Sequence, residues 1–319
     1  MCGAVVRSGS PSGFLPLLGS RTVSRTGIAD GSSEYETPGS PGPPSCGTVR
    51  EAIFVLLADK TVIVSGVGPG LGHEVAAACV REGARVVLGA RTEANLAGCA
   101  AAVDPGGSRS AYRAVDIRDD EQCAALAALA AERFGGIDAV VHVAALDTIA
   151  GGVEGADLAE WQPALDINLL GTLRMTQACL PALKASAEAR GDSSVVMIGT
   201  QASVAPPAQE QRAAYSASKG ALVTAMYSLA HELGPDGVRV NTVQPGWMWG
   251  PKVEQYVTWA AKSEGVAPEV VRGRLEERMP LRRMAQDGDV AETAVFFASE
   301  RARAITGQCL LVNAGEVMR

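Results

Sequence analysis

From Lys60 onward, short β-branched and apolar runs alternate with longer segments rich in Ala and Leu. Short apolar runs are typical of strands buried on both faces, and the segments between them predict helices that cover a parallel sheet. The expected strands are Thr61–Ser65, Arg85–Leu88, Ala111–Val115, Ala139–Val143, Ser194–Ile198, Arg239–Val243 and Gln308–Val312. The most evident helices are His73–Arg81, Glu121–Arg133, Trp161–Ser186 and Ala213–Leu233. Residues 51–319 therefore predict one α/β domain, a three-layer doubly wound parallel sheet of about seven strands.

The first 50 residues have a different composition. They are rich in Gly, Ser and Pro, including the run Pro38–Pro44, and too few of them are apolar to offset the entropy of ordering. We expect a disordered N-terminal extension over residues 1–50. Its arginines faintly resemble a transit peptide, but a flexible leader or an over-extended start is favoured. No apolar run in the chain approaches the ~18 residues that a membrane span requires.

Charge and cysteine usage exclude several classes of function. The chain of 319 residues has a net charge of −7, which disfavours a general affinity for nucleic acid or an anionic membrane. Its seven cysteines form no C-x-x-C pair, and its three histidines are far apart in sequence. The sequence therefore predicts no metal site and a cytoplasmic protein whose partner is a small-molecule substrate.

A glycine-rich turn follows the first expected strand. It reads Ser65-Gly66-Val67-Gly68-Pro69-Gly70-Leu71-Gly72 and leads into the first expected helix. Glycines allow close approach of the backbone to a pyrophosphate, and the helix N-terminus supplies N–H donors and a positive dipole. The spacing does not satisfy G-x-G-x-x-G, yet its place between strand and helix favours binding of a dinucleotide cofactor.

Tyr215 and Lys219 lie four residues apart in the expected helix Ala213–Leu233. Residues at this spacing share a helix face. A nearby cation favours the phenolate, so we expect Lys219 to lower the pKa of Tyr215 and make it an acid/base catalyst.

Together these motifs resemble the short-chain dehydrogenase/reductase family, NAD(P)-dependent oxidoreductases with a Rossmann-like fold. The resemblance covers nearly all of residues 55–319. Further landmarks occur in the family's order: Asp116, Asn168, Pro245-Gly246 and Thr306-Gly307. It implies that Gly66, Gly68, Gly70, Leu71 and Gly72 bind the pyrophosphate and that Asp116 contacts the adenine. It also implies that Pro245, Gly246 and the following stretch, with Met248, border the nicotinamide.

The resemblance implies a catalytic group of a serine, Tyr215, Lys219 and Asn168, with Lys219 also on the nicotinamide ribose. Asn168 would position a water that passes protons toward Lys219. The serine is replaced, because the position 13 residues before Tyr215 is Ala202. Alignment of the strand puts Thr200 in its place, whereas Ser203 is the alternative closest to the usual spacing.

Two departures concern the cofactor. At the end of the second strand, Ala90 and Arg91 stand where an acidic residue would bond a ribose 2′-hydroxyl. A guanidinium pairs with a 2′-phosphate, so we expect NADP(H) to be preferred and NAD(H) to be possible. At the fourth strand, His142-Val143-Ala144-Ala145 replaces the family's Asn-Asn-Ala-Gly. Ala144 still permits approach of the cofactor, and His142 is interpreted as a structural donor rather than a functional replacement.

Aromatic residues gather after Pro245-Gly246, where relatives carry a mobile substrate lid. Only 4% of the chain is aromatic, yet Trp247, Trp249, Tyr256 and Trp259 all lie in the expected lid at about 246–280. This clustering favours a bulky, ring-containing apolar ketone or secondary alcohol. Packing of the lid, or an oligomer contact, is the alternative explanation.

Two rival functions stay open. Enoyl reductases of this fold usually separate Tyr and Lys by six residues rather than three, so carbonyl chemistry is favoured. The altered serine and Asn-Asn elements also permit a catalytically silent NADP-binding sensor or scaffold. The resemblance further implies a homo-oligomer, a tetramer or dimer, formed through the long helices.

Overall fold

The computed structural model describes residues 55–207 and 211–319, so the expected extension over residues 1–50 lies outside the described residues. Seven parallel strands form one sheet in the order β3-β2-β1-β4-β5-β6-β9. Their bounds are β1 Thr61–Ser65, β2 Arg85–Ala90, β3 Ser110–Ala114, β4 Ala139–His142, β5 Ser193–Ile198, β6 Val238–Pro245 and β9 Cys309–Val312. The expected α/β fold with a doubly wound parallel sheet is confirmed, and each expected strand agrees with an observed one to within about two residues.

Helices connect the strands. They are α1 Leu71–Arg81, α2 Glu93–Val103, α3 Asp120–Phe134, α4 Gln162–Leu165, α5 Thr172–Arg190, α6 Ala213–Leu233, α7 Pro251–Glu264, α8 Pro268–Glu277 and α9 Asp287–Ala298. The expected helical stretch Trp161–Ser186 is confirmed, but it is not one regular α-helix. A π-helical segment, Asp166–Gly171, joins α4 to α5, and it carries Asn168. Such segments frequently occur at functional sites.

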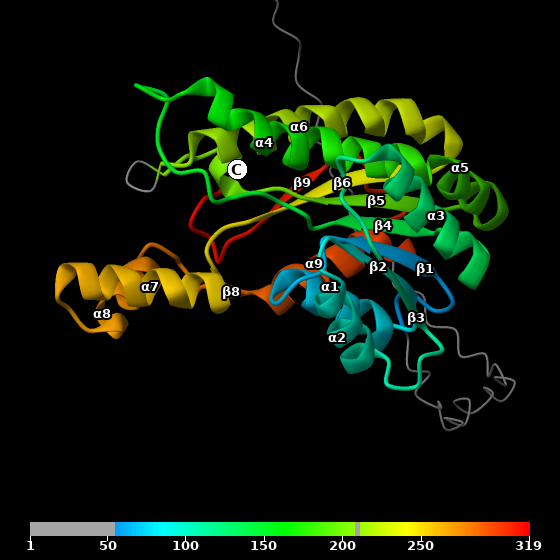
Figure 1. Ribbon diagram of the computed structural model, residues 1–319, viewed down its shortest axis with the longest axis horizontal. Coiled ribbons are helices and arrows are strands. Elements are labelled where there is room, and N and C mark those ends of the chain that lie inside the picture. The colour runs from blue at the N-terminus through cyan, green and yellow to red at the C-terminus, as the bar shows by residue number, and fades with distance from the viewer. Residues whose placement is uncertain (1–54, 208–210) are drawn as a thin grey trace, which may run out of the picture. The chain divides into compact units, whose positions relative to one another are not determined.

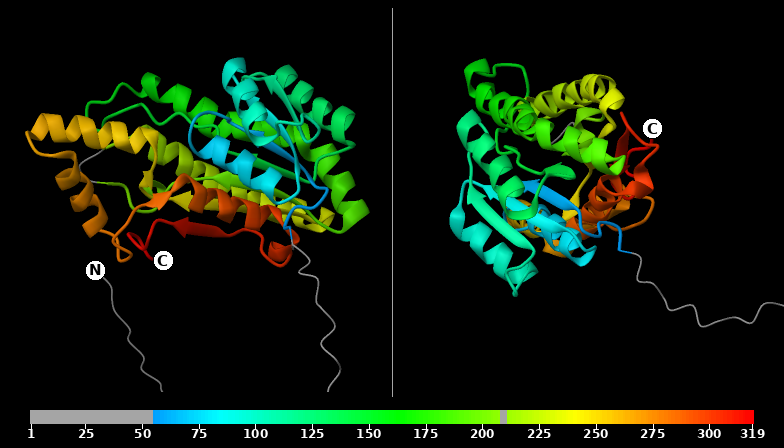
Figure 2. Two further views of the ribbon diagram at one scale, coloured as in Figure 1. Left: turned by 90° about the horizontal axis from the view of Figure 1, so that it is seen from below. Right: turned by 90° about the vertical axis from the view of Figure 1, so that its right-hand side faces the viewer.

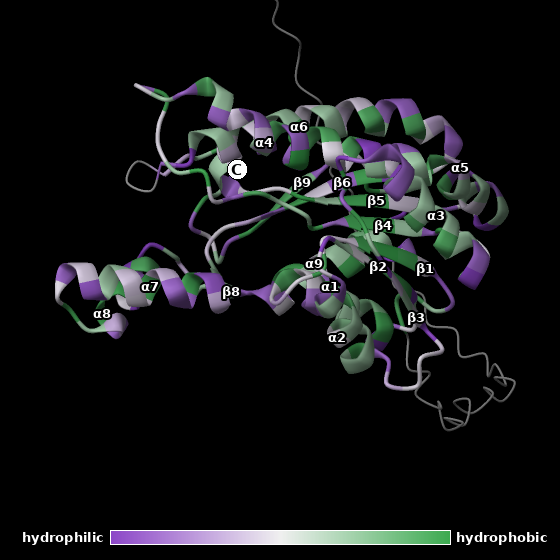
Figure 3. Cartoon of the chain, in the orientation of Figure 1, coloured by the Kyte–Doolittle hydropathy of each residue, from purple (hydrophilic) through white to green (hydrophobic). Residues whose placement is uncertain are grey.

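The sheet lies between two layers of helices (Figures 1 and 2). The alternation of side chains along each strand explains this three-layer arrangement. Val62 and Val64 of β1 face a cluster with α1, α2 and α9, whereas Ile63 faces a cluster with α3, α5 and α6. Successive residues of a strand point to opposite faces, so one strand contributes to two cores. Figure 3 shows the result as strands that are mostly hydrophobic between helices of mixed hydropathy.

Helices α7 and α8 have a small core of their own. Figure 1 shows them as a helix pair beside the main layers. Val257, Ala261, Val271 and Leu275 are buried there together with Met279. The chain enters this pair through β7, Met248–Trp249, and leaves it through β8, Ala285–Gln286, and these two short strands are paired in parallel.

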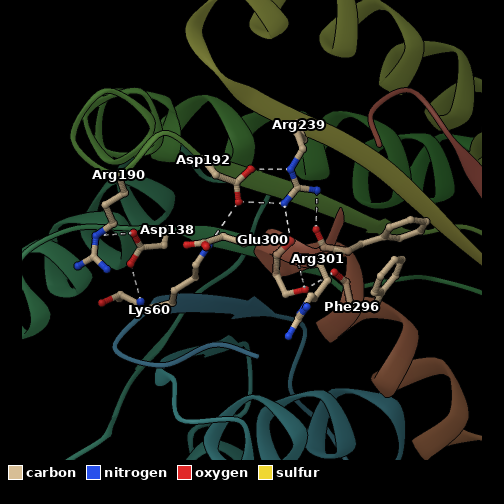
Figure 4. A network of polar contacts seen from close by, with 11 residues as sticks. Lys60, Asp138, Arg190, Asp192, Arg239, Phe296, Glu300 and Arg301 are labelled. Carbon is tan, nitrogen blue, oxygen red and sulfur yellow. Dashed lines mark hydrogen bonds and ion pairs between the residues drawn. The ribbon is translucent and has the colours of Figure 1, made fainter. Parts of the chain in front are cut away.

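A buried polar network ties together the amino ends of the strands (Figure 4). The Arg239 guanidinium donates to both oxygens of Asp192, at 2.6 and 3.2 Å, and the Lys60 ammonium donates to Asp192 at 3.3 Å. Arg239 also donates to the carbonyls of Phe297 and Ser299 at the end of α9. All three charged side chains are nearly inaccessible to water, so each depends on the others for compensation.

The candidate site lies at the opposite, carboxyl ends of the strands. The strand order changes direction between β1 and β4, and ligands of doubly wound sheets bind at such a point. The backbones of Gly66 and Ala144 meet there. A Cβ atom added to Gly66 would lie 2.1 Å from the nitrogen of Ala144, so only glycine fits.

Candidate active site at the carboxyl ends of the strands

Thr200 and Tyr215 come together at the end of β5. Thr200 lies two residues beyond the strand and begins a 3₁₀ turn, Gln201–Ser203, whose Ala202 N–H donates to the threonine hydroxyl at 3.2 Å. Tyr215 lies in the first turn of α6, and the Thr200 hydroxyl is close enough to its phenol to lower the pKa of that group. Two side chains able to contact one substrate oxygen therefore lie side by side.

Ser203, the alternative to Thr200, has other partners. Its hydroxyl donates to the Thr200 carbonyl at 2.8 Å and accepts from the side-chain amide of Gln244 at 3.1 Å. Both contacts hold Ser203 to the backbone turn and to the end of β6. Of the two candidate hydroxyls, the one that acts on the pKa of Tyr215 is that of Thr200.

The expected lowering of the pKa of Tyr215 was wrong. Burial and, to a smaller extent, the Asp147 carboxylate raise the pKa of Tyr215 to about 12, while the Thr200 hydroxyl opposes both. Asp147 follows β4 and was not predicted as a site residue. Its carboxylate accepts from the Lys252 ammonium of α7 at 3.1 and 3.0 Å.

Lys219 is buried one helical turn beyond Tyr215. Its ammonium donates to the Ile198 carbonyl at 2.6 Å, which anchors it at the end of β5 near Thr200. Burial lowers the pKa of Lys219 to about 8, and Asp147 opposes this shift. A lysine of this kind loses its proton near neutral pH more readily than an exposed one.

Asn168 connects the loop after β4 to α6. Its side-chain oxygen accepts from the Leu146 N–H at 2.7 Å, and its amide nitrogen donates to the Leu146 carbonyl and to the Ser218 hydroxyl, both at 2.9 Å. The hydroxyl of Thr172 donates to the Asn168 carbonyl at 3.1 Å. Asn168 thus holds the loop after β4 against the part of α6 that carries Tyr215.

His142 is buried at the end of β4. Its Nε2 atom is hydrogen-bonded to the Thr176 hydroxyl of α5 at 2.9 Å. Burial lowers the pKa of His142 to about 3, and the neighbouring Lys219 lowers it further, so the imidazole is neutral at physiological pH. This environment agrees with the interpretation of His142 as a structural hydrogen-bonding residue.

The glycine-rich turn has the geometry of a phosphate cradle. A Cβ atom on Gly72 would lie 2.4 Å from the Gly66 carbonyl oxygen, whereas one on Gly68 would meet nothing within 4 Å. Gly70, with φ of 101°, is the N-cap of α1, and no side chain caps that helix. The turn therefore presents an open, uncapped helix N-terminus, which fits the pyrophosphate of a dinucleotide.

The expected adenosine end contains Arg91, Arg118 and the carboxylate of Asp116. Arg91 is exposed after β2, and Asp116 follows β3. The Arg118 guanidinium donates to both oxygens of Asp116, and it lowers the pKa of Asp116 to about 2, with a smaller contribution from Arg91. The carboxylate is thus neutralised by Arg118, which leaves Arg91 as the cation suited to a phosphate.

Most of the lid aromatics pack against the core of α7 and α8. Trp247, Trp249 and Tyr256 contact it, with Trp247 and Tyr256 ring centroids 5.1 Å apart. The Arg272 guanidinium lies 4.1 Å from the centre of the Trp249 ring. Trp259, 66% exposed, is the one of the four that extends into solvent. The packing explanation therefore accounts for three of these rings.

Comparisons with known proteins identify the family. A family sequence profile described as Enoyl-(Acyl carrier protein) reductase matches residues 66–316. The chain is 34% identical over 258 residues to bovine (Bos taurus) L-fucose dehydrogenase, covering 81% of this chain and 89% of the relative. A Brucella melitensis structure titled short-chain dehydrogenase/reductase, glucose/ribitol dehydrogenase, aligns with a TM-score of 0.72 and 28% identity, covering 83% and 99% of the two chains.

The chain is a short-chain dehydrogenase/reductase.

A further solved structure of the family is a single-residue variant of actinorhodin polyketide ketoreductase with NADPH. It aligns with a TM-score of 0.72 and 29% identity, covering 81% of this chain and 97% of that one. The chain is thus similar to proteins named as dehydrogenases and ketoreductases, and it is an NAD(P)-dependent oxidoreductase. In the part of this short-chain dehydrogenase/reductase that the structure describes, no helix is long and apolar enough to cross a membrane.

Sequence reasoning missed three residues that shape this dehydrogenase/reductase site. Asp147 and Arg118 were missed because their importance depends on through-space neighbours, Tyr215 and Asp116. Glu316 was missed for the same reason. Its carboxylate accepts from the Gln201 amide at 2.6 Å and pairs with Arg278, which joins the turn after Thr200 to the end of α8. Only a motif specific to these loops would have revealed them.

Proposed function

We propose that this protein interconverts a ketone and a secondary alcohol with NADP(H), on a bulky, ring-containing apolar substrate, with Tyr215 as the acid/base. The Thr200 hydroxyl acts on the phenol of Tyr215, one helical turn before the buried Lys219, and this arrangement is the observation that carries the proposal. It supports a site in which one substrate oxygen contacts a proton donor and a second hydroxyl.

Each residue has a distinct role in this proposal. Tyr215 gives its proton to the oxygen of the ketone during reduction and takes it back during alcohol oxidation. Thr200 donates a hydrogen bond to the same oxygen and stabilises negative charge that develops on it. Lys219 holds its ammonium at the end of β5 and would bond the nicotinamide ribose, and Asn168 holds the loop after β4 against α6. NADP(H), when bound, supplies or accepts the hydride.

The glycine-rich turn, Ala144 and the stretch Pro245, Gly246 and Met248 would hold this cofactor. Arg91 at the adenosine end supports NADP(H) over NAD(H), because the carboxylate of Asp116 is already paired with Arg118. The similar ketoreductase structure that contains NADPH supports the same choice. NAD(H) remains usable in this proposal, since the pyrophosphate and nicotinamide contacts are common to both.

A ring-containing substrate is supported by two observations. The similar proteins named above act, by their names, on a sugar and on a polyketide. The faces of Trp247 and Tyr256, which are only half-buried, provide apolar surface near Gly246. The α7–α8 pair would act as the substrate lid. A polyhydroxylated ring in place of an apolar one is the second candidate, and the sugar dehydrogenase relative favours it.

An enoyl reductase is the alternative named by the family profile. Three residues lie between Tyr215 and Lys219, which argues against it, since enoyl reductases of this fold usually have six residues between the two. Turnover of NADPH with a panel of cyclic ketones, sugars and an enoyl thioester separates the three reactions. Oxidation of NADPH by the thioester alone would contradict the proposal, and cofactor binding without turnover of any substrate would favour a silent sensor or scaffold.

A further inference from the structure

The carboxylate of Asp287 lies between two glycines from separate loops. Asp287 is the first residue of α9. A Cβ atom added to Gly70 would lie 3.0 Å from Asp287 Oδ2, and one added to Gly250 would lie 2.7 Å from the same oxygen. Gly70 is the N-cap of α1, and Gly250 precedes α7. A single carboxylate oxygen thus closely approaches the backbone of both the phosphate turn and the entry to the lid.

Few positive charges compensate this carboxylate. Among the described residues, Glu74 of α1 faces it with a second negative charge and Lys252 of α7 with a positive one. Lys252, however, is already paired with both oxygens of Asp147. On α9 itself, Asp289 accepts from Arg283 and from the Gln286 N–H. Burial raises the pKa of Asp287 above its usual range, Glu74 raises it further, and Lys252 opposes them.

A pyrophosphate at the N-terminus of α1 would lie beside this carboxylate. Two neighbouring negative charges repel each other, whereas a protonated Asp287 is neutral and can donate a hydrogen bond to a phosphate oxygen. Binding of the cofactor would therefore favour the protonated form. By reciprocity, protonation of Asp287 would favour binding.

We propose that Asp287 makes cofactor affinity depend on protons, so that the pyrophosphate binds with uptake of a proton by this side chain. The inference rests on the proposed cofactor site. Affinity then falls as pH rises and Asp287 ionises. NADPH and NADH are affected equally, because both carry the same pyrophosphate and differ only at the distant adenosine ribose. If the bound cofactor raises the pKa of Asp287 by one unit, the neutral form binds it about tenfold more tightly.

Titration of the full chain with NADPH and NADH, followed by nicotinamide fluorescence from mildly acidic to mildly alkaline pH, tests the proposal. The isosteric Asp287→Asn is expected to bind both cofactors about tenfold more tightly than wild type at alkaline pH, with a weaker dependence on pH. Glu292→Gln removes one negative charge from the same helix, at a site paired with Arg81. This variant is expected to change neither the cofactor affinity nor its dependence on pH.

Calorimetric titration of wild type in two buffers with different ionisation enthalpies gives the second measurement. Net proton uptake is expected, and its absence would overturn the proposal even if the variant failed to fold. Binding by Asp287→Asn that is unchanged or weaker, or a gain confined to NADPH, would also overturn it. So would binding that needs a divalent cation and is lost with Asp287. If wild type binds neither cofactor at any pH, the proposed function itself fails.

Discussion

The hydroxyl of Thr200 lowers the pKa of the phenol of Tyr215, which lies 15 residues further along the chain and in a different element of the fold. Thr200 is held by the turn after β5, and Tyr215 by the first turn of α6. Neither side chain needs to move far to contact a common substrate oxygen. The first prediction concerns this pair.

Thr200→Val should lower kcat by about 10²- to 10³-fold, the usual cost of removing one donor to a developing oxyanion. Thr200→Ser keeps the hydroxyl and should retain most activity. Ser203→Ala should have little effect, because that hydroxyl contacts the Thr200 carbonyl and Gln244. Steady-state kinetics with saturating cofactor compares the three, and a larger loss in Ser203→Ala than in Thr200→Val would reverse the assignment.

Tyr215→Phe should bind NADPH like wild type but lose turnover, because the ring is retained and the exchangeable proton is not. Fluorescence titration measures binding, and oxidation of NADPH measures turnover. Tyr227→Phe, on the same helix but half-exposed, serves as the control and should stay active. More than a few per cent of residual activity in Tyr215→Phe would contradict its role.

Asp147→Asn should shift the pH profile of alcohol oxidation to lower pH. The Asp147 carboxylate disfavours the phenolate and raises the pKa of Tyr215, so its removal lowers that pKa and the ionised form is reached earlier as pH rises. The profile of kcat/KM against pH measures the shift. Glu154→Gln, an exposed carboxylate of the following loop, should leave the profile unchanged. A shift to higher pH in Asp147→Asn would contradict the electrostatic argument.

Arg91→Ala should raise the KM for NADPH while leaving that for NADH nearly unchanged, because only NADPH carries a 2′-phosphate. Arg113→Ala, an exposed arginine of β3, provides the control for the loss of a surface charge. Equal effects on the two cofactors, or a wild type without preference for NADPH, would show that Arg91 does not select the cofactor.

Asp192→Ala should destabilise the fold by about 3–5 kcal/mol, because it leaves the buried charges of Arg239 and Lys60 without their shared partner. The free energy of unfolding in urea measures this loss. Asp236→Ala breaks an exposed ion pair with Lys184 and should cost less than about 1 kcal/mol. Similar losses in the two variants would mean that burial of the Asp192 network contributes little.

The sequence alone predicted the order of strands and helices, since buried parallel strands are continuous apolar runs whose ends fall at glycines and polar residues. It also located Tyr215, Lys219 and the glycine-rich turn, because their spacing is local and follows from helix and turn geometry. It did not predict the π-helical segment Asp166–Gly171. That interruption accompanies side-chain bonds of Asn168 to Leu146 and Ser218, which are distant in sequence.

The electrostatics of the site were decided by the tertiary structure. A four-residue spacing brings Lys219 near Tyr215, but burial and the approach of Asp147 raise the pKa of Tyr215 instead of lowering it. The choice between Thr200 and Ser203 as the partner of Tyr215 likewise depends on the direction of the turn after β5. Periodicity and spacing describe one element at a time. Burial, charge and hydrogen bonding at this site come from elements that meet only when the sheet is assembled.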